Sequence, residues 1–174
     1  MGLEDKEIKQ QLPTIQPAGE IVAKKHMQLP SDNVITDSLI RELIKEAIGM
    51  LKRAYTPYSN FKVGAALLSK SKKIYTGCNI ENATYTPTNC AERTAFFKAI
   101  SEGETEFTAI AIVGGKNGNL SDYCPPCGVC RQVMMEFCDP KKFVVILARN
   151  ENDYWAYSLA DLLPLGFSAI NLDQ

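Results

Sequence analysis

Two short clusters of residues carry the clearest chemical signal in the sequence. The first is Cys-Ala-Glu at 90–92, and the second is Pro-Cys-Gly-Val-Cys at 126–130. Two thiolates three residues apart in a tight turn can both reach one ion at a Zn–S distance of about 2.3 Å, and a third cysteine from another element completes the set. We therefore expect Cys90, Cys127 and Cys130 to bind one zinc ion and to leave its fourth coordination position to water.

The number of ligands favours a catalytic metal over a structural one. A closed structural zinc site needs a fourth protein ligand, and the single histidine of the chain, His26, lies far from both clusters near the N-terminus. A structural zinc module for protein binding would also leave Glu92 without a role.

Glu92 is placed to act on a water molecule at the metal without being a ligand itself. A buried carboxyl group beside an anionic site has a raised pKa, which suits a group that takes a proton from water and delivers it later. Alone, a glutamate in the first turn of a helix would be explained by the helix dipole. Its position two residues after Cys90 favours the catalytic role.

The three thiolates give the metal site a negative charge that opposes activation of water, so the protein must offset it. Both clusters are expected at helix N-termini, each of which supplies roughly half a positive charge. Arg93 and Arg131 follow the ligand motifs and can add donors to the sulfur atoms. For Arg93 we favour this role, whereas for Arg131 an exposed position on a helix is an equal alternative.

The elements that must position these residues follow from the spacing of apolar side chains. The first half predicts an amphipathic helix from possible caps at 36–38 to before Pro57, a hairpin of strands 63–68 and 74–78, an irregular stretch 79–89 and a helix 90–101. The second half predicts a strand 109–113 closed by Gly114 and Gly115, a helix near 128–137, strands 143–148 and 154–158, and a short helix 160–163 stopped by Pro164. Strands mixed with helices indicate an α/β domain with a central sheet and helices on both faces.

Bulk properties narrow the class further. The chain has 174 residues, 45% of them hydrophobic, which suits one compact domain, and its formal net charge of −1 gives no basic surface for nucleic acid. No segment approaches the ~20 apolar residues of a membrane span, and no secretory core follows the N-terminus, so we expect a cytoplasmic protein. Residues 1–37 are predicted to form a poorly structured extension and 38–174 the domain.

Five longer blocks of sequence resemble the small cytidine deaminases of pyrimidine salvage, in the same order along the chain. The blocks are Tyr-Thr-Pro-Tyr-Ser-Asn-Phe-Lys-Val-Gly-Ala-Ala from 55, Gly-Cys-Asn-Ile-Glu-Asn-Ala from 77, Asn-Cys-Ala-Glu-Arg-Thr-Ala from 89, Pro-Cys-Gly-Val-Cys-Arg-Gln-Val from 126 and Leu-Leu-Pro-Leu-Gly-Phe from 162. The resemblance implies a three-layer α/β/α fold with a mixed sheet and one zinc ion per subunit. It also implies a homotetramer with shared active sites.

The same resemblance implies the reaction. Cytidine and deoxycytidine would be converted to uridine and deoxyuridine, with water adding at C4 of the ring, Glu92 protonating N3 and ammonia leaving. The charge balance argues against the nucleotide and polynucleotide deaminases of the same superfamily, which need phosphate-binding residues.

Further site residues are implied only by the resemblance. Asn79 and Glu81 would hold the ribose hydroxyl groups, although the residues alone suggest a turn asparagine and a solvated glutamate. Phe61 would lie against the nucleoside, whereas composition alone suggests a core residue.

Three more residues complete the implied substrate site. The backbone of Ala91 would meet the edge of the base. Phe167 would close the pyrimidine pocket of a neighbouring subunit, and Tyr85 would likewise reach a neighbouring site.

The remaining cysteines include one departure from the family. Cys124 creates a second Cys-x-x-Cys that overlaps the first, which leaves a choice of ligand pair and permits a thiol redox protein as a rival interpretation. We favour Cys127 and Cys130, because a proline precedes the first ligand as in the family. Cys78 and Cys138 are predicted to be small buried thiols.

Overall fold

The computed structural model of the chain describes residues 35–172. His26 and nearly all of the predicted extension 1–37 lie outside the described residues. Ile35 is already buried, and Thr36 caps the first helix by accepting a hydrogen bond from the Leu39 amide. The folded part that the structure describes therefore begins at the very end of the predicted extension.

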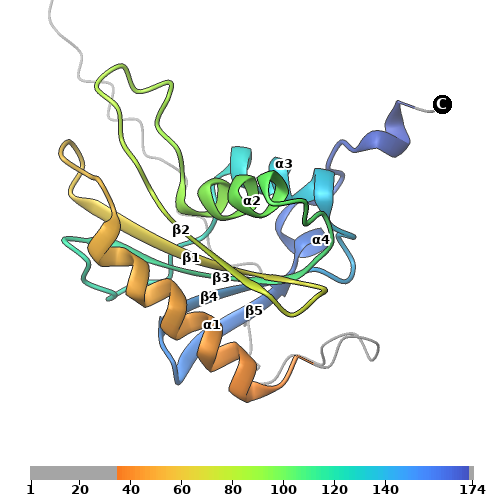
Figure 1. The fold of residues 1–174 in the computed structure, drawn as a ribbon, viewed down its shortest axis with the longest axis horizontal. Helices are drawn as coiled ribbons and strands as arrows, with labels where there is room; N and C mark the ends of the chain where they lie inside the picture. Colours follow the sequence, from red (N-terminus) through yellow and green to blue (C-terminus); the bar gives the residue numbers. More distant parts are fainter. Residues whose placement is uncertain (1–34, 173–174) are drawn as a thin grey trace, which may run out of the picture.

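A five-stranded mixed sheet forms the centre of the domain (Figure 1). The strands are β1 (Phe61–Ser69), β2 (Ile74–Cys78), β3 (Phe107–Lys116), β4 (Val144–Asn150) and β5 (Asp153–Ser158), in the spatial order β2-β1-β3-β4-β5. β3 and β4 are parallel, and all the other neighbouring pairs are antiparallel. The predicted hairpin of the first two strands is confirmed.

Helices cover both faces of this sheet. On one side lies α1 (Asp37–Met50), extended by the short η1 (Leu51–Arg53). On the other side lie α2 (Ala91–Ser101), α3 (Gly128–Phe137) and the single-turn α4 (Leu159–Leu162), before η2 (Ala169–Asn171) near the C-terminus (Figure 1). The three-layer α/β/α architecture predicted from the sequence is confirmed.

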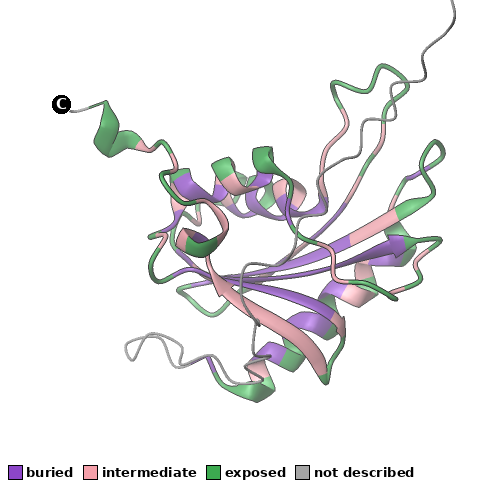
Figure 2. Ribbon diagram, turned by 180° about the vertical axis from the view of Figure 1, so that it is seen from behind, coloured by how far each residue is buried: buried purple, intermediate pink, exposed green. Residues whose placement is uncertain are grey.

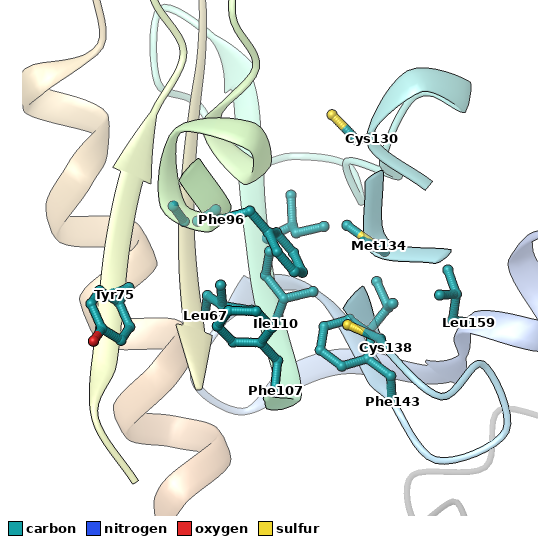
Figure 3. Packing of buried hydrophobic residues seen from close by; sticks show 14 of the residues in the cluster. Leu67, Tyr75, Phe96, Phe107, Ile110, Cys130, Met134, Cys138, Phe143 and Leu159 are labelled. Atoms are coloured by element: carbon teal, nitrogen blue, oxygen red, sulfur yellow. The ribbon is translucent and has the colours of Figure 1, made fainter. Parts of the chain in front are cut away.

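Alternation along the strands builds two hydrophobic cores. In β1, Ala65 and Leu67 face α2 and α3, whereas Ala66 and Leu68 face α1. Figure 3 shows the first of these cores, in which Phe96 of α2 packs against side chains of the sheet and of α3. Central strands are buried on both faces, as Figure 2 shows, so the elements that carry the cysteine clusters rest on a rigid base.

The predicted end of the third strand at Gly114 and Gly115 is wrong. β3 continues through both glycines to Lys116, and they pair with Val63 and Lys62 of β1. A Cβ atom on Gly115 would lie 1.7 Å from the carbonyl oxygen of Asn119. These glycines therefore allow the following loop to fold back onto the strand, which is a reason for glycine inside a strand rather than at its end.

Gly77 of β2 sets the height of α2 above the sheet. A Cβ atom at Gly77 would lie 2.2 Å from the carbonyl oxygen of Ala91 and 2.6 Å from the amide nitrogen of Ala95. Both contacts are with helix backbone, which cannot rotate away. The absence of a side chain at Gly77 thus lets the first turn of α2, with its cysteine cluster, lie directly on the sheet.

Replacing Gly77 by alanine should destabilise the domain by at least about 2 kcal/mol, because the helix must move to relieve the overlap. Urea unfolding measures this change. Gly49→Ala is the matched control, since a Cβ at this exposed α1 position meets nothing within 4 Å. It should raise stability by about 0.5–1 kcal/mol. Equal unfolding midpoints for Gly77→Ala and the wild type would contradict the assigned role.

Cys78 and Cys138 are buried, as predicted for small core thiols. Within the part of the chain that the structure describes, no helix is both long and apolar enough to span a membrane.

Candidate active site

The three predicted ligand sulfurs meet where two helices begin. Cys90 is the N-cap of α2, Cys127 is the N-cap of α3, and Cys130 lies in the first turn of α3. All three sulfur atoms lie within 4.8 Å of one another.

The spacing of these sulfurs fits a tetrahedral zinc ion. The Sγ atoms of Cys90 and Cys127 are 3.8 Å apart. Two thiolates bound to one ion at about 2.3 Å with tetrahedral geometry also lie about 3.8 Å apart. The donor set is therefore ready for zinc, with three protein ligands and room for a fourth from solvent or substrate.

The sulfur cluster lies at the N-termini of both α2 and α3. Neither Cys90 nor Cys127 makes a side-chain capping hydrogen bond. The unpaired N–H groups and the dipoles of two helices of 11 and 10 residues therefore favour negative charge on the sulfur atoms.

The thiolate form is already favoured at Cys90. A hydrogen bond from the Cys130 thiol is the main reason that the pKa of Cys90 falls to about 5, with further contributions from Arg93 and Cys127. Because Cys130 is the donor in that bond, its own pKa is raised. The cluster thus holds negative charge that a cation would neutralise.

Arg93 lies beside the first ligand, as the sequence predicted. Its Nη2 atom donates to the carbonyl oxygen of Thr88 at 3.0 Å and contacts the sulfur of Cys90 at 3.8 Å. The Nε atom is buried without a partner among the described residues. Arg93 therefore brings a positive charge to the cluster and ties the irregular stretch before α2 to that helix.

Arg131 takes neither of the two roles left open by the sequence. It is half-buried, and its Nη1 atom donates to the carbonyl oxygen of Leu162 at 2.6 Å. The next residue, Gln132, donates from Nε2 to the carbonyl oxygen of Phe167 at 2.9 Å. These two side chains of α3 hold the backbone of the C-terminal segment, a long-range contact that sequence spacing does not reveal.

Glu92 is buried in the first turn of α2, with 4% of its surface exposed. Burial raises the pKa of its carboxyl group to about 7, and the Cys90 thiolate pushes it in the same direction. A carboxyl group with this pKa can both accept and donate a proton near neutral pH. The structure thus gives Glu92 the environment that the sequence analysis expected.

Asn79 is held firmly against the start of β1. Its Nδ2 atom donates to the carbonyl oxygen of Phe61, and its Oδ1 atom accepts from the amide of Val63, both at 2.8 Å. One amide hydrogen of Asn79 remains for a further partner.

Glu81 closes onto the turn before β1. Its carboxylate accepts hydrogen bonds from the amides of Tyr58 at 2.9 Å and Ser59 at 3.3 Å, and from the Ser59 hydroxyl. These bonds, with that from Ser59 first, lower the pKa of Glu81. Glu81 is therefore an ionised carboxylate that lines a pocket, rather than a free surface residue.

That pocket has a volume of about 290 Å³. Its walls come from the turn before β1 and from the irregular stretch after β2, and they consist of Tyr58, Ser59, Glu81, Asn82, Tyr85 and Thr88. Tyr85 has a positive φ of 61°, unusual for an aromatic residue, and its ring centroid lies 6.4 Å from that of Tyr58. Tyr58, Ser59, Asn82 and Thr88 were not predicted from the sequence, although the first three lie in the blocks that carry the family resemblance.

The other implied substrate residues differ in exposure. Phe61 is 41% exposed, so composition alone was wrong to suggest a core position. Ala91, the first residue of α2, is fully buried, whereas Phe167, which follows α4, is 56% exposed.

Cys124 stands apart from the sulfur cluster. Only Cys90, Cys127 and Cys130 form a potential metal-binding group among the described residues. Cys124 instead packs on Gly114 of β3, where a Cβ atom would lie 2.8 Å from its sulfur. Burial raises the pKa of the Cys124 thiol to about 12, and nearby Glu92 adds to this. The geometry supports the predicted ligand pair.

Comparison with known proteins gives a consistent result. Residues 37–147 match the family model described as the cytidine and deoxycytidylate deaminase zinc-binding region. The chain is 48% identical to a cytidine deaminase of Sporosarcina psychrophila over 133 residues, which cover 76% of this chain and 94% of that protein. It is 49% identical to a cytidine deaminase of Halalkalibacterium halodurans over 76% of this chain and 96% of that protein.

A solved structure agrees with the fold. The crystal structure of cytidine deaminase from Burkholderia pseudomallei superposes with a TM-score of 0.65 at 47% sequence identity, covering 72% of this chain and 97% of that one. The family model spans both cysteine clusters, and the two relatives are matched over nearly their whole length. The chain therefore belongs to the cytidine and deoxycytidylate deaminase family, with a zinc-binding site formed by Cys90, Cys127 and Cys130.

Proposed function

We propose that this chain catalyses the hydrolytic deamination of cytidine and deoxycytidine to uridine and deoxyuridine, with release of ammonia. The observation that carries the proposal is the buried Glu92 beside three sulfur atoms that lie within 4.8 Å of one another, with those of Cys90 and Cys127 at the 3.8 Å spacing of a tetrahedral zinc site. Its relatives named cytidine deaminase, matched over nearly their whole length, support the same substrate.

Cys90, Cys127 and Cys130 would hold the zinc ion. When bound, zinc supplies Lewis acidity that makes water a nucleophile near neutral pH. Arg93 and the two helix N-termini offset the negative charge of the three thiolates, so that the ion keeps this acidity.

Glu92 is the proton carrier of the reaction. Its carboxylate accepts a proton from the attacking water and delivers it to N3 of the cytosine ring while C4 becomes tetrahedral. Glu92 then carries the proton of the new C4 hydroxyl group to the amino group, so that the C4–N bond breaks, ammonia leaves and the C4 carbonyl of uridine forms. Burial gives Glu92 a pKa of about 7, so both protonation states are accessible near neutral pH.

The ribose lies at the pocket beside Glu81. The remaining amide hydrogen of Asn79 and the carboxylate of Glu81 bind the sugar hydroxyl groups, and Phe61 covers the nucleoside. The backbone of Ala91 meets the edge of the base. These contacts fix C4 of the ring relative to Glu92, which is the part of catalysis that positioning supplies.

The assembly is a homotetramer with shared active sites. Exposed Tyr85 and Phe167 support this part of the proposal, because both rings stand out from the subunit where another copy can cover them. Tyr85 reaches a neighbouring site, and Phe167 closes a neighbour's pyrimidine pocket. We place this enzyme in pyrimidine salvage in the cytoplasm.

Free nucleosides are favoured over nucleotides and polynucleotides. Among residues 35–172, no lysine or arginine lines the pocket beside Glu81, and the pocket contains a carboxylate that repels phosphate. The formal net charge of −1 points the same way.

The test is turnover of cytidine by the purified protein, followed by the absorbance change on conversion to uridine. We expect activity with one zinc ion bound per chain, loss of activity with a strong chelator, and recovery on adding zinc. Cytidine monophosphate and single-stranded RNA serve as comparison substrates. They should react at least about tenfold more slowly, because their phosphate groups would lie at the pocket without a positively charged partner. A folded, zinc-loaded protein that leaves cytidine unchanged would contradict the proposal.

A further inference from the structure

A cluster of polar and aromatic side chains joins the loop before α3 to the hairpin of β4 and β5. The Tyr123 hydroxyl donates to Oδ1 of Asp153. Arg149 donates from Nε to Oδ2 of Asp153 at 2.7 Å and from Nη1 to the carbonyl oxygen of Ser121 at 3.2 Å. These contacts fasten the middle of loop 117–127 to the sheet.

Aromatic contacts complete this cluster. The guanidinium carbon of Arg149 lies 4.9 Å from the centre of the Tyr123 ring. On another side, Tyr123 meets Trp155 edge to face with ring centroids 5.9 Å apart. Tyr123 is therefore held by its hydroxyl group, by its ring face and by its ring edge, so its position is well defined.

A β-bulge aims Arg149 at the loop. The pairing register of β4 and β5 shifts between Ala148 and Asn150, so Arg149 is the extra residue on β4. Bulges of this kind redirect a side chain, and they are common beside functional sites. The sheet thus departs from regular pairing at the residue that binds both Asp153 and the loop.

The chain between Tyr123 and the ligand Cys127 is unusually stiff. It consists of Cys124, Pro125 and Pro126. The two prolines have a fixed φ, and the residue before each proline is restricted to extended conformations. In addition, Cys124 rests on Gly114 of β3 without space for a Cβ atom between them. A displacement of Tyr123 is therefore passed on to Cys127 instead of being absorbed.

We propose that Tyr123, Asp153 and Arg149 are positioning residues that set the place of the zinc ligand Cys127 through the Pro125–Pro126 segment. The inference rests on the zinc site of the proposed function but not on the identity of the substrate. It predicts that breaking the Tyr123–Asp153 hydrogen bond loosens zinc binding even though neither residue touches the metal.

Tyr123→Phe tests this directly, because it keeps the ring and removes only the hydroxyl group. Zinc release from the loaded protein to a chromogenic chelator should become about tenfold faster, as for other partners that orient metal ligands. Asp153→Ala, which removes the acceptor of that hydrogen bond, should show a similar increase. In the double variant the two increases should not multiply, because both changes break the same bond.

Tyr154→Phe is the matched control. This change also removes only a tyrosine hydroxyl group, from the residue that follows Asp153 in β5. The Tyr154 hydroxyl lies 3.5 Å from Asp37 at the start of α1, on the other face of the sheet. Zinc release from this variant should stay within about twofold of the wild type, as expected for a site with no path to the metal. The cobalt-loaded proteins give a second readout, in which the thiolate-to-cobalt absorption should change in Tyr123→Phe and not in Tyr154→Phe.

A merely structural role predicts a different pattern. Thermal unfolding would then shift while zinc release and the cobalt spectrum remained as in the wild type. If Tyr123→Phe does not fold, the same measurements on Asp153→Ala decide the matter. Folded variants that release zinc at the wild-type rate, while the wild type converts cytidine, would overturn this inference and leave the proposed function intact. A folded wild type that binds no zinc would instead overturn the proposed function.

Discussion

Glu92→Gln should reduce kcat on cytidine by about 10²–10⁴-fold, the usual contribution of a positioned general acid and base. The amide keeps the shape of the side chain but can neither accept the proton of the attacking water nor deliver it to the ring. Zinc should remain bound at one ion per chain, because Glu92 does not belong to the sulfur cluster. Turnover and metal analysis on the same preparation measure both effects.

Two further observations sharpen this test. Burial disfavours the charged form of Glu92, so the neutral amide should leave the thermal stability unchanged or increase it. Glu102→Gln makes the same change at the other end of α2, where Glu102 forms an exposed ion pair with Lys73 at 2.7 Å. That control should retain full activity. A Glu92→Gln enzyme with wild-type kcat would remove Glu92 from the mechanism.

Cys127→Ala should abolish stoichiometric zinc binding and, with it, activity. Two remaining thiolates cannot supply the three-ligand set of a catalytic zinc site. The domain should also become less stable, since the free energy of metal binding contributes to folding. Metal content, cytidine turnover and thermal unfolding of the purified variant measure these effects.

Cys124→Ala is the matched comparison, because it removes the first thiol of the overlapping Cys-x-x-Cys. Cys124 lies outside the sulfur cluster, so this variant should keep one zinc ion and most of its activity. The opposite pattern, with zinc lost from Cys124→Ala and kept in Cys127→Ala, would transfer the ligand role to Cys124. It would also favour the hypothesis that the two cysteines of this loop, Cys124 and Cys127, form a thiol redox motif.

The sequence predicted those parts of the site that depend on short spacing. Cys127 and Cys130 belong to one helical turn, and Cys90 and Glu92 belong to another, so local geometry decides which groups can meet a metal. The long helix α1 and the hairpin of β1 and β2 were predicted for the same reason, because their apolar periodicity is a local property.

Other features depend on contacts between distant segments, which no local pattern encodes. Gly114 and Gly115 look like the end of a strand until the loop that folds back onto them is known. Arg131 looks like an exposed residue or a partner of the sulfurs, yet its guanidinium group binds the carbonyl oxygen of Leu162. Tyr123 and Asp153 are ordinary polar residues in the sequence, 30 residues apart, and only the folded chain brings them into hydrogen-bond contact.

The parallel pairing of β3 and β4 has a consequence for the order of folding. The hairpin of β1 and β2 can form early, because its strands are neighbours in the sequence. β3 and β4 can pair only after the connection between them, which contains α3, has crossed one face of the sheet. Cys127 and Cys130 belong to this crossover, while Cys90 precedes β3. We therefore expect a nascent chain to capture zinc firmly only after β4 has emerged and joined the sheet, so that metal loading marks the completion of the domain.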